Sequence, residues 1–589
     1  MTKTIVKNTI VKNTIVKNTI VKNTKKTNKS KKTSTLFNFN NLFNTNTKSQ
    51  SSQNTKSQSS QNTKSQSSKN TKSSLKKIVS KLQDEYNLKK NKEIINSYYA
   101  LNNPITSYLI KYNDNENKTL INNGFDNLEL VQSYPFPEID EQIKSIDIIY
   151  KQHKELLKEL KLKDITPIIK YSSEDLTRGI RTYLDNRFKD LPINLSNGFV
   201  KLWEILHTFN LMNETKCMNQ TQTQKKIIQN RSFNVLHIAE APGQMILCAK
   251  YYAEKKNSNI TNYEWRANSL NPFNNEVKQH FSALKDNYKL MRNNPTKWLW
   301  GADNTGDITR VKNIKWIRNY ITNKWLKNKE TNKETNKETN KETNKETDKE
   351  TNTNTEKVKK EQVKVEHVKL DLIIGDGGMG ADTNSSYNLQ KLDLAQVINV
   401  LAYSSINGSC IIKHFTPYMI NKPESIEATS FFISFIYLYY LAFEEVNLYK
   451  PYTSDITSGE FYIICKGFKG IDETVINKLY TILNNFTVNK ALFKKNAISE
   501  TFINQMLTFI TLLTNYNIKG YEKQNYLLEC YKNNKKSKNS KKTYTSRSTK
   551  STKSTKSIKT NCNYFLNEKE IETILIPRYN QWVNLFEFE

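Results

Sequence analysis

Charged side chains occur inside or at the ends of several short apolar segments of this sequence. Lys413 lies within the apolar run 410–415, Asp376 ends the run DLIIGD just before two glycines, and Glu460 begins the run EFYIICKGF. Burying a lysine or a carboxylate among apolar residues is costly unless the charge is paired or takes part in chemistry. These residues therefore predict either a structural Lys–Asp ion pair or an active site that handles a proton.

A second group of candidates surrounds a Pro-Gly turn. The segment HIAEAPG ends at Gly243, follows an apolar run and precedes Gln244. Ligands of open α/β sheets bind at the carboxyl ends of strands, where a glycine allows close approach and a helix N-terminus favours a carboxylate. The segment is neither a dinucleotide fingerprint nor a P-loop, which argues against dinucleotides and nucleoside triphosphates. By itself it can equally be an ordinary turn.

Two further segments contain residues suited to a nucleoside. Glu264 and Trp265 lie in YEWRANSLNP, about 20 residues after Gly243, where an acid can bind a ribose diol and an aromatic ring can pack on a base. Asp307 ends the Gly- and Asn-rich stretch GADNTGD and could accept a hydrogen bond from an adenine amino group. The plainer interpretations are an exposed glutamate beside a core tryptophan, and a turn.

The elements that must position these residues alternate along the chain. Apolar runs typical of buried strands occupy residues 235–240, 371–376, 409–415 and 460–468. A helical pattern, such as residues 388–405, lies between them, and this alternation predicts an α/β domain with a largely parallel sheet over about residues 191–470. The thirteen apolar residues 431–443 are too few to span a bilayer, so we expect a buried helix and no membrane partner.

Composition predicts the remaining organisation of the 589 residues. The net charge is +33, and two segments without any Asp or Glu, residues 1–77 and 532–559, carry +28 of it. We expect disordered basic segments at 1–77 and 532–560, helical regions at 78–190 and 471–531, a low-complexity insertion at 323–366 and an ordered C-terminal segment at 561–589. The basic segments either attract phosphate backbones or only solvate the chain.

Cysteine use and the N-terminal sequence bear on the compartment. The six cysteines form no C-x-x-C pair, which argues against a disulfide scaffold and a cysteine-rich zinc module. No apolar signal segment is visible near Met1, and the six histidines show no metal-ligand spacing. We therefore expect a reducing, cytoplasmic location and no metal.

Taken together, the motifs resemble the FtsJ-like 2′-O-ribose methyltransferases, whose sites use a Lys-Asp-Lys-Glu tetrad. The matching positions are Lys201 in FVKLWEI, Asp376, Lys413 and Glu460. The resemblance is strongest to the Adrift-type, cap-specific branch, through HIAEAPG, YEWRANSLNP, WLWGADNTGDI, DLIIGDGG, KPYTS and GEFYIICKGF. It covers about residues 195–470 and implies a Rossmann-fold methyltransferase, with a mostly parallel seven-stranded sheet and helices on both faces.

The resemblance also implies a cofactor and its contacts. S-adenosyl-L-methionine would lie with its methionine end near Gly243 and Gln244, its ribose near Glu264, and its adenine near Asp307. Trp265 and Asp376 complete the expected cofactor-binding set. No metal is needed for this reaction.

The same resemblance implies roles for the tetrad. Lys413 would be the base, Asp376 would orient its amine, and Glu460 would hold Lys201 or the ribose hydroxyl. We expect burial, the charge of Lys201 and the bound sulfonium to lower the pKa of Lys413.

The implied substrate is RNA, foremost the first or second nucleotide of a capped mRNA, with capping or transcription machinery as a further partner. Two alternatives remain: the same chemistry on ribosomal or transfer RNA, and an inactive methyltransferase fold that serves as an RNA-binding scaffold. Gln244 replaces a second glycine, Asp455 replaces an arginine common in related cap enzymes, and Ser458 with Gly459 stands where the family often has Asn-Ser. The Asn, Lys and Ile bias and the short repeats resemble proteins of large cytoplasmic DNA viruses, which implies work in the host cytoplasm.

Overall fold

The computed structural model describes residues 107–111, 124–160, 179–188, 191, 195–212, 231–257, 260–280, 285–326, 370–378, 386–417, 428–543 and 568–588. All of them belong to one unit of the chain, Ser51–Glu589. The predictions for residues 1–77, for residues 327–366 of the insertion and for residues 544–560 of the linker lie outside the described residues.

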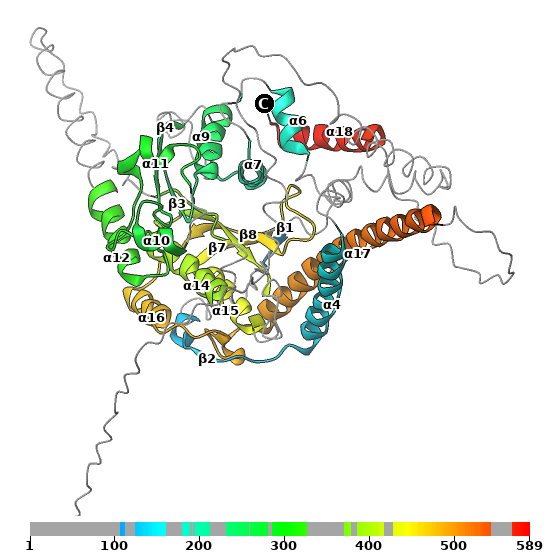
Figure 1. The fold of residues 1–589 in the computed structure, drawn as a ribbon. Coiled ribbons are helices and arrows are strands. Elements are labelled where there is room, and N and C mark those ends of the chain that lie inside the picture. Colours follow the sequence, from blue (N-terminus) through cyan, green and yellow to red (C-terminus); the bar gives the residue numbers. More distant parts are fainter. Residues whose placement is uncertain are drawn as a thin grey trace, which may run out of the picture. The chain divides into compact units, whose positions relative to one another are not determined.

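One seven-stranded sheet forms the centre of this unit, in the order β1-β7-β8-β6-β5-β3-β4 (Figure 1). Its parallel neighbours are β4 (Ile260–Ala267), β3 (Arg231–Ile238), β5 (Leu372–Gly375) and β6 (Ser409–Phe415). Antiparallel pairings add β8 (Glu460–Phe468), β7 (Phe443–Tyr449) and β1 (Ser107–Leu109). Five of the seven strands therefore run in one direction, which confirms the expected Rossmann-like α/β fold.

Helices cover both faces of the sheet, as the alternation of buried strand residues shows. Val235 and Ile374 pack with α7 (Asn197–Phe209), α9 (Gln244–Lys256) and α18 (Glu568–Leu585). Leu236 and Ile373 point to the other face, and that face packs with α12 (Val311–Tyr320), α14 (Ser386–Tyr403), α15 (Ala428–Ala442), α16 (Glu473–Asn484) and α17 (Glu500–Thr543). Because the central strands are buried on both faces, they read as continuous apolar runs in the sequence.

Helix α15 contains most of the long apolar run. Every residue from Ala428 to Ala442 is buried, as expected for a helix that packs between a sheet and other helices. Among the described residues, no helix combines the length and apolarity needed to cross a bilayer.

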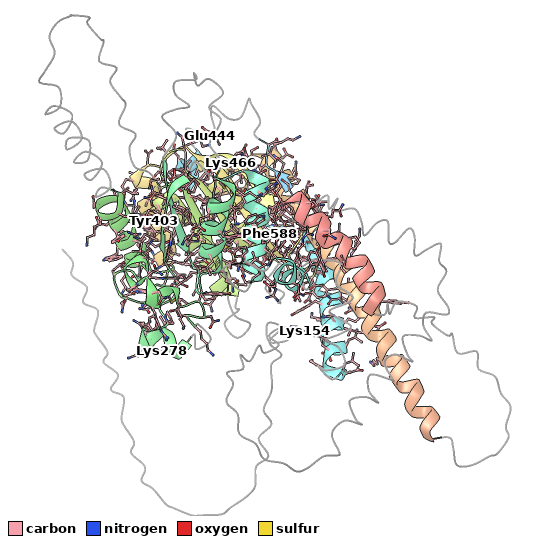
Figure 2. All side chains as sticks on the ribbon, turned by 90° about the horizontal axis from the view of Figure 1, so that it is seen from above. Lys154, Lys278, Tyr403, Glu444, Lys466 and Phe588 are labelled. Atoms are coloured by element: carbon pink, nitrogen blue, oxygen red, sulfur yellow. The ribbon has the colours of Figure 1, made fainter. Side chains whose placement is uncertain are left out.

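The region predicted to be helical before residue 190 also contains strands, which the prediction missed. Alongside η2 (Gly124–Asn127), α4 (Pro137–Glu159) and α6 (Ile180–Arg187), it supplies β1 to the large sheet and β2 (Val131–Gln132) to a pair with β9 (Lys490–Ala491). Strands of two or three residues are too short to show an alternating pattern. Helix α4 lies along α17, where His153 Nδ1 and Asn525 Oδ1 are 2.7 Å apart (Figures 1 and 2).

Two predicted boundaries are wrong. Helix α17 continues to Thr543, beyond the predicted start of a disordered linker at residue 532, because each residue added to an existing helix gains a hydrogen bond without a new nucleus. The insertion begins later than residue 323, because η4 (Ile321–Leu326) buries Trp325 against the core. The remaining short helices are α10 (Asn275–His280), α11 (Leu290–Asn293), η3 (Pro295–Lys297) and η7 (Lys495–Ala497).

Candidate active site

The four tetrad residues meet as two ion pairs at one edge of the sheet. Asp376 directly follows β5, and its Oδ1 lies 2.9 Å from Nζ of Lys413 on the neighbouring strand β6. Glu460 begins β8, and its Oε1 lies 2.5 Å from Nζ of Lys201 on α7. All four side chains are mostly buried. The sequence predicted these residues, and the structure brings them together.

Helix α7 carries Lys201 to the carboxyl ends of the strands. Ser196 caps the helix, its Oγ accepting a hydrogen bond from the amide of Phe199 at 3.1 Å. The first turn lies close to the site: a Cβ built on Gly198 would be 3.1 Å from Oε1 of Gln244 and 3.8 Å from Oδ2 of Asp376. Gly198 therefore allows an approach that places α7 against both predicted cofactor-binding residues.

Glu460 is held as a carboxylate by surrounding lysines. Burial would raise its pKa, but the charges of Lys201, Lys413 and Lys450 outweigh burial and lower the pKa to about 2. The Ser454 hydroxyl also donates a 3.0 Å hydrogen bond to Glu460 Oε1, and Lys450 Nζ donates to Ser454 Oγ at 2.9 Å. Lys450 was missed by the sequence analysis, although its charge inside KPYTS was a usable signal.

The expected lowering of the Lys413 pKa does not hold for this structure. Burial acts in the expected direction, but the carboxylates of Asp376 and Glu460 outweigh it and raise the pKa of Lys413 above its ordinary value. With both carboxylates in place, the Lys413 amine is therefore an ammonium group at neutral pH.

Tyr462 is a further residue of the site that sequence reasoning passed over. It lies opposite Lys413 in the β6–β8 register, and its hydroxyl is 3.4 Å from Oδ1 of Asp376. Burial, followed by the charge of Asp376, raises its pKa well above the ordinary value, so it stays a neutral donor. In the sequence it was one aromatic residue of an apolar strand, with no distinguishing signal.

The Pro-Gly turn is closely packed, as predicted, but the N-terminus of α9 that follows it is already occupied. Gly243 has a φ of 105°, and a Cβ there would lie 2.4 Å from Cδ1 of Leu290. The carboxylate of Glu240 already caps α9, because Glu240 Oε1 accepts from the amide of Met245 at 2.8 Å. The start of α9 thus binds a carboxylate from within the chain. We had expected this helix terminus to bind the carboxylate of a ligand, and the structure corrects that expectation.

Glu240 is the acceptor that fits the cationic end of an amino-acid ligand. Its second oxygen, Oε2, is buried without a hydrogen-bond partner among the described residues. Burial, and then the charge of Asp376, raises its pKa well above the ordinary value. An ammonium group placed beside Glu240 and Asp376 would relieve both effects. The chemistry of this pair therefore suits the aminoacyl portion of S-adenosylmethionine.

Glu264 and Trp265, predicted to meet a ribose and a base at a strand end, do not lie at the carboxyl edge of the sheet. In the parallel register Glu264 is opposite Asn234, well before the end of β3, and its carboxylate lies 3.5 Å from Arg266. Trp265 is buried in a small aromatic cluster with Trp298. The sequence motif was recognised, but it was placed three residues too early relative to the strand end at Ala267.

Asp307 does lie near the carboxyl end of β4. The loop before it packs directly on that end, because a Cβ on Gly306 would be 1.7 Å from the carbonyl oxygen of Ser269. Asp307 Oδ1 accepts from the amide of Thr309 at 2.9 Å, and Oδ2 lies 3.1 Å from Arg310 Nε. The neighbouring Asn268 Oδ1 is buried without a hydrogen-bond partner among the described residues, so Asn268 is a ligand candidate that sequence reasoning missed.

Within the described ranges, no group of three or more His, Cys, Asp or Glu side chains could hold a metal ion. The acidic residues named above are paired with lysine, arginine or backbone donors instead.

The parallel sheet core, the helices on both faces and the charged residues at the strand ends define a Rossmann-like α/β enzyme fold. Residues 195–468 match the family of FtsJ-like methyltransferases, and this part of the chain is an FtsJ-like methyltransferase domain. The match begins just before α7 and ends with β8, so it contains all four tetrad residues.

Several curated proteins are similar over a larger part of the chain. An uncharacterized protein of Acanthamoeba polyphaga mimivirus is 24% identical, over 60% of this chain and 36% of its own length. The mouse cap-specific mRNA (nucleoside-2′-O-)-methyltransferase 2 is 22% identical, over 57% of this chain and 36% of its own length. A probable methyltransferase of African swine fever virus (isolate Pig/Kenya/KEN-50/1950) is 24% identical, over 59% of this chain and 68% of its own length. The chain thus spans about a third of the length of the first two relatives.

Proposed function

We propose that this protein transfers the methyl group of S-adenosylmethionine to a ribose 2′-hydroxyl of RNA, at the first or second nucleotide of a capped mRNA. The observation that supports this most directly is the pair of lysine–carboxylate contacts, Lys413 with Asp376 and Lys201 with Glu460. The name of the mouse relative, a cap-specific mRNA 2′-O-methyltransferase, supports the RNA and cap assignment.

The carboxylates of the site would hold the donor. S-adenosylmethionine would supply an activated methyl group, and Glu240 and Asp376 would face its positively charged portion. Gly243 and Gln244 would border the same end, and Asp307 would accept from its base. Lys413 and Lys201, both held by carboxylates, would then stand where the ribose hydroxyl enters.

Proton transfer would centre on Lys413 Nζ. In the structure Asp376 and Glu460 keep this amine protonated, since they raise its pKa. A cation bound beside Asp376 would offset that carboxylate and favour loss of the Lys413 proton, after which Nζ can accept the proton of the 2′-hydroxyl. Lys201, ion-paired with Glu460, would stabilise the oxygen as it becomes negative.

Positioning would supply a large part of the rate. Lys201 comes from a helix and the other three residues from the strand ends, so their relative placement depends on the packing of α7 on the sheet. Holding two reacting groups in line at the correct distance removes much of the entropic barrier.

The test is methyl transfer from tritiated S-adenosylmethionine to matched RNAs. One RNA carries a 7-methylguanosine cap, one carries that cap with the first nucleotide already methylated, and one has no cap. We expect label only in capped RNA, at a 2′-oxygen, with the preferred cap form showing which nucleotide is modified. Equal labelling of uncapped RNA would contradict capped mRNA as the substrate and would support ribosomal or transfer RNA instead. Failure to bind S-adenosylmethionine would point to an inactive scaffold.

A further inference from the structure

The C-terminal segment packs directly behind the helix that carries Lys201. Trp582, Phe586 and Phe588 are all buried, and the Phe588 ring lies 4.7 Å from the ring of Trp203 (Figure 2, where Phe588 is labelled). The indole of Trp203 also donates a 2.8 Å hydrogen bond to the carbonyl oxygen of Phe586. The C-terminal segment follows a long lysine-rich stretch in sequence, yet its residues Tyr579, Trp582, Val583, Phe586 and Phe588 belong to the same hydrophobic cluster as α7.

Glu204, one turn after Lys201 on α7, is the polar centre of this packing. It is fully buried, and its two oxygens accept four hydrogen bonds. The donors are Tyr449 Oη (2.6 Å), the Tyr452 amide (2.6 Å), Thr453 Oγ1 (3.1 Å) and Trp582 Nε1 (3.0 Å). A buried carboxylate needs such donors, because an unpaired one would be expelled from the interior or protonated.

These donors connect Glu204 to the partner of Lys201. Tyr452 and Thr453 lie in the loop between β7 and β8, and the next residue, Ser454, donates to Glu460 Oε1 at 3.0 Å. Lys450 holds the same loop through hydrogen bonds to the carbonyl oxygens of Ser458 (2.6 Å) and Glu460 (3.0 Å). Glu204 thus fixes α7 relative to the loop, and so fixes Lys201 relative to Glu460.

From these contacts we infer that residues 579–588 are a part of the active site's supporting structure, and that Glu204 and Trp582 are positioning residues for the Lys201–Glu460 pair. The inference rests on the proposed function and deepens it, because it names residues that act on the tetrad from behind. Trp582 satisfies one carboxylate oxygen of Glu204 and closes the cluster over it, so its loss frees α7 to shift.

Trp582→Phe and Glu204→Gln test this inference. The first keeps an aromatic ring but removes the N–H donor, and the second keeps the shape but removes the charge that four donors face. Trp316→Phe is the matched control, because Trp316 is 39% exposed on α12, which packs on the opposite face of the sheet. Thermal unfolding of each variant reports whether the fold survives.

The first readout is kinetic. We expect kcat to fall about ten-fold in Trp582→Phe and Glu204→Gln, since small displacements of catalytic groups have effects of this size or larger. KM for S-adenosylmethionine should stay within about two-fold, because neither residue is among the proposed cofactor contacts. The acid limb of the kcat–pH profile should move to higher pH, because a Glu460 carboxylate less closely paired with Lys201 would raise the pKa of Lys413, the proposed base, further.

The second readout does not need activity. Lys201 is 9% exposed and ion-paired, so acetic anhydride should acylate it slowly in the wild-type protein. In both variants we expect acylation of Lys201 to speed up about ten-fold, as counted by mass spectrometry, with Lys312 as the exposed reference. Trp316→Phe should change neither readout.

The outcomes separate the two proposals. Folded variants with wild-type Lys201 acylation and an unchanged pH profile would overturn the positioning role. A wild-type protein that transfers no methyl group but shows the expected acylation differences would overturn the proposed function and leave the positioning role standing.

Discussion

The carboxyl edge of the sheet has two sides that differ in how their charges are arranged. On the lysine side, formed by α7, β5, β6 and β8, each tetrad lysine finds its carboxylate from a distant part of the chain. On the loop side, formed by the end of β4 and residues 301–310, the acids find partners close in sequence. Asp307 binds Thr309 and Arg310, and Asp303 Oδ1 accepts a hydrogen bond from the hydroxyl of Thr305.

This difference shows on which side the charged residues are not explained by local structure alone. Partners that are two or three residues away cap turns and helices in any protein, so the acids of the loop side are explained by local structure. The ion pairs of the lysine side join segments far apart in sequence and are mostly buried, which costs desolvation energy that a purely structural contact seldom recovers. The lysine side is therefore where changes should affect chemistry most.

The largest expected effect is that of Lys413→Ala. We expect kcat to fall by about 10³-fold, within the range for a lost acid–base group, while S-adenosylmethionine still binds. The measurement pairs tritium transfer to capped RNA with equilibrium binding of the labelled donor. Turnover near that of the wild type would remove Lys413 from its role, and loss of donor binding would place Lys413 in the cofactor site instead.

A smaller effect should come from separating the second ion pair. Lys201→Met and Glu460→Gln should each lower kcat about 10²-fold, and the double variant should be little worse than either single one, because the two residues act as a unit. Rates of all three variants, measured at one pH with saturating donor, complete the cycle. Effects that multiply would show that Lys201 and Glu460 contribute independently.

Burial of the central strands on both faces made much of the fold predictable from the sequence. The same burial made the residues of the lysine side predictable. The centres of the two runs, residues 372–374 and 410–412, are wholly apolar because β5 and β6 are covered on both faces, and this pattern is visible without a structure. A lysine within such a run stands out, because its charge must be paired. The strand β1 was not predictable, because three residues at a sheet edge carry no periodic signal.

The site was predicted less completely than the fold, because sequence does not define strand register. Glu264 was assigned to a strand end that the structure places at Ala267, and Asn268 was passed over. Glu204 and Tyr462 were missed for a related reason: their importance depends on partners far away in sequence, such as Trp582 and Asp376. The sign of the Lys413 pKa shift was also wrong, because two carboxylates outweigh burial.

Between the two sides lies His237, near the end of β3, which should make stability depend on pH. Burial lowers its pKa to about 3, against an unfolded value near 6.5. Below pH 6.5, His237 becomes protonated in the unfolded chain but stays neutral in the folded chain. The free energy of unfolding therefore falls as pH decreases. By pH 5 this loss is about 2 kcal/mol.

His237→Gln should remove that part of the pH dependence. Denaturant unfolding of both proteins at pH 7 and pH 5 gives the comparison, since other titrating groups contribute to both. We expect the difference between the two pH values to be about 2 kcal/mol smaller in the variant. Equal differences in the two proteins would mean that His237 is protonated in the fold.

The smallest expected effect compares Glu264, in the middle of β4, with Asp307 on the loop side. Glu264→Gln should change the dissociation constant for S-adenosylmethionine less than about two-fold, because the carboxylate lies in mid-strand and its ion pair with Arg266 is partly exposed. Asp307→Asn is the matched comparison, because Asp307 lies beside the end of β4, and we expect about five-fold weaker binding there from the loss of a charged acceptor. Isothermal titration of the donor measures both. A larger loss in Glu264→Gln than in Asp307→Asn would reverse the placement of the ribose and would show that the middle of β4, not its end, faces the cofactor.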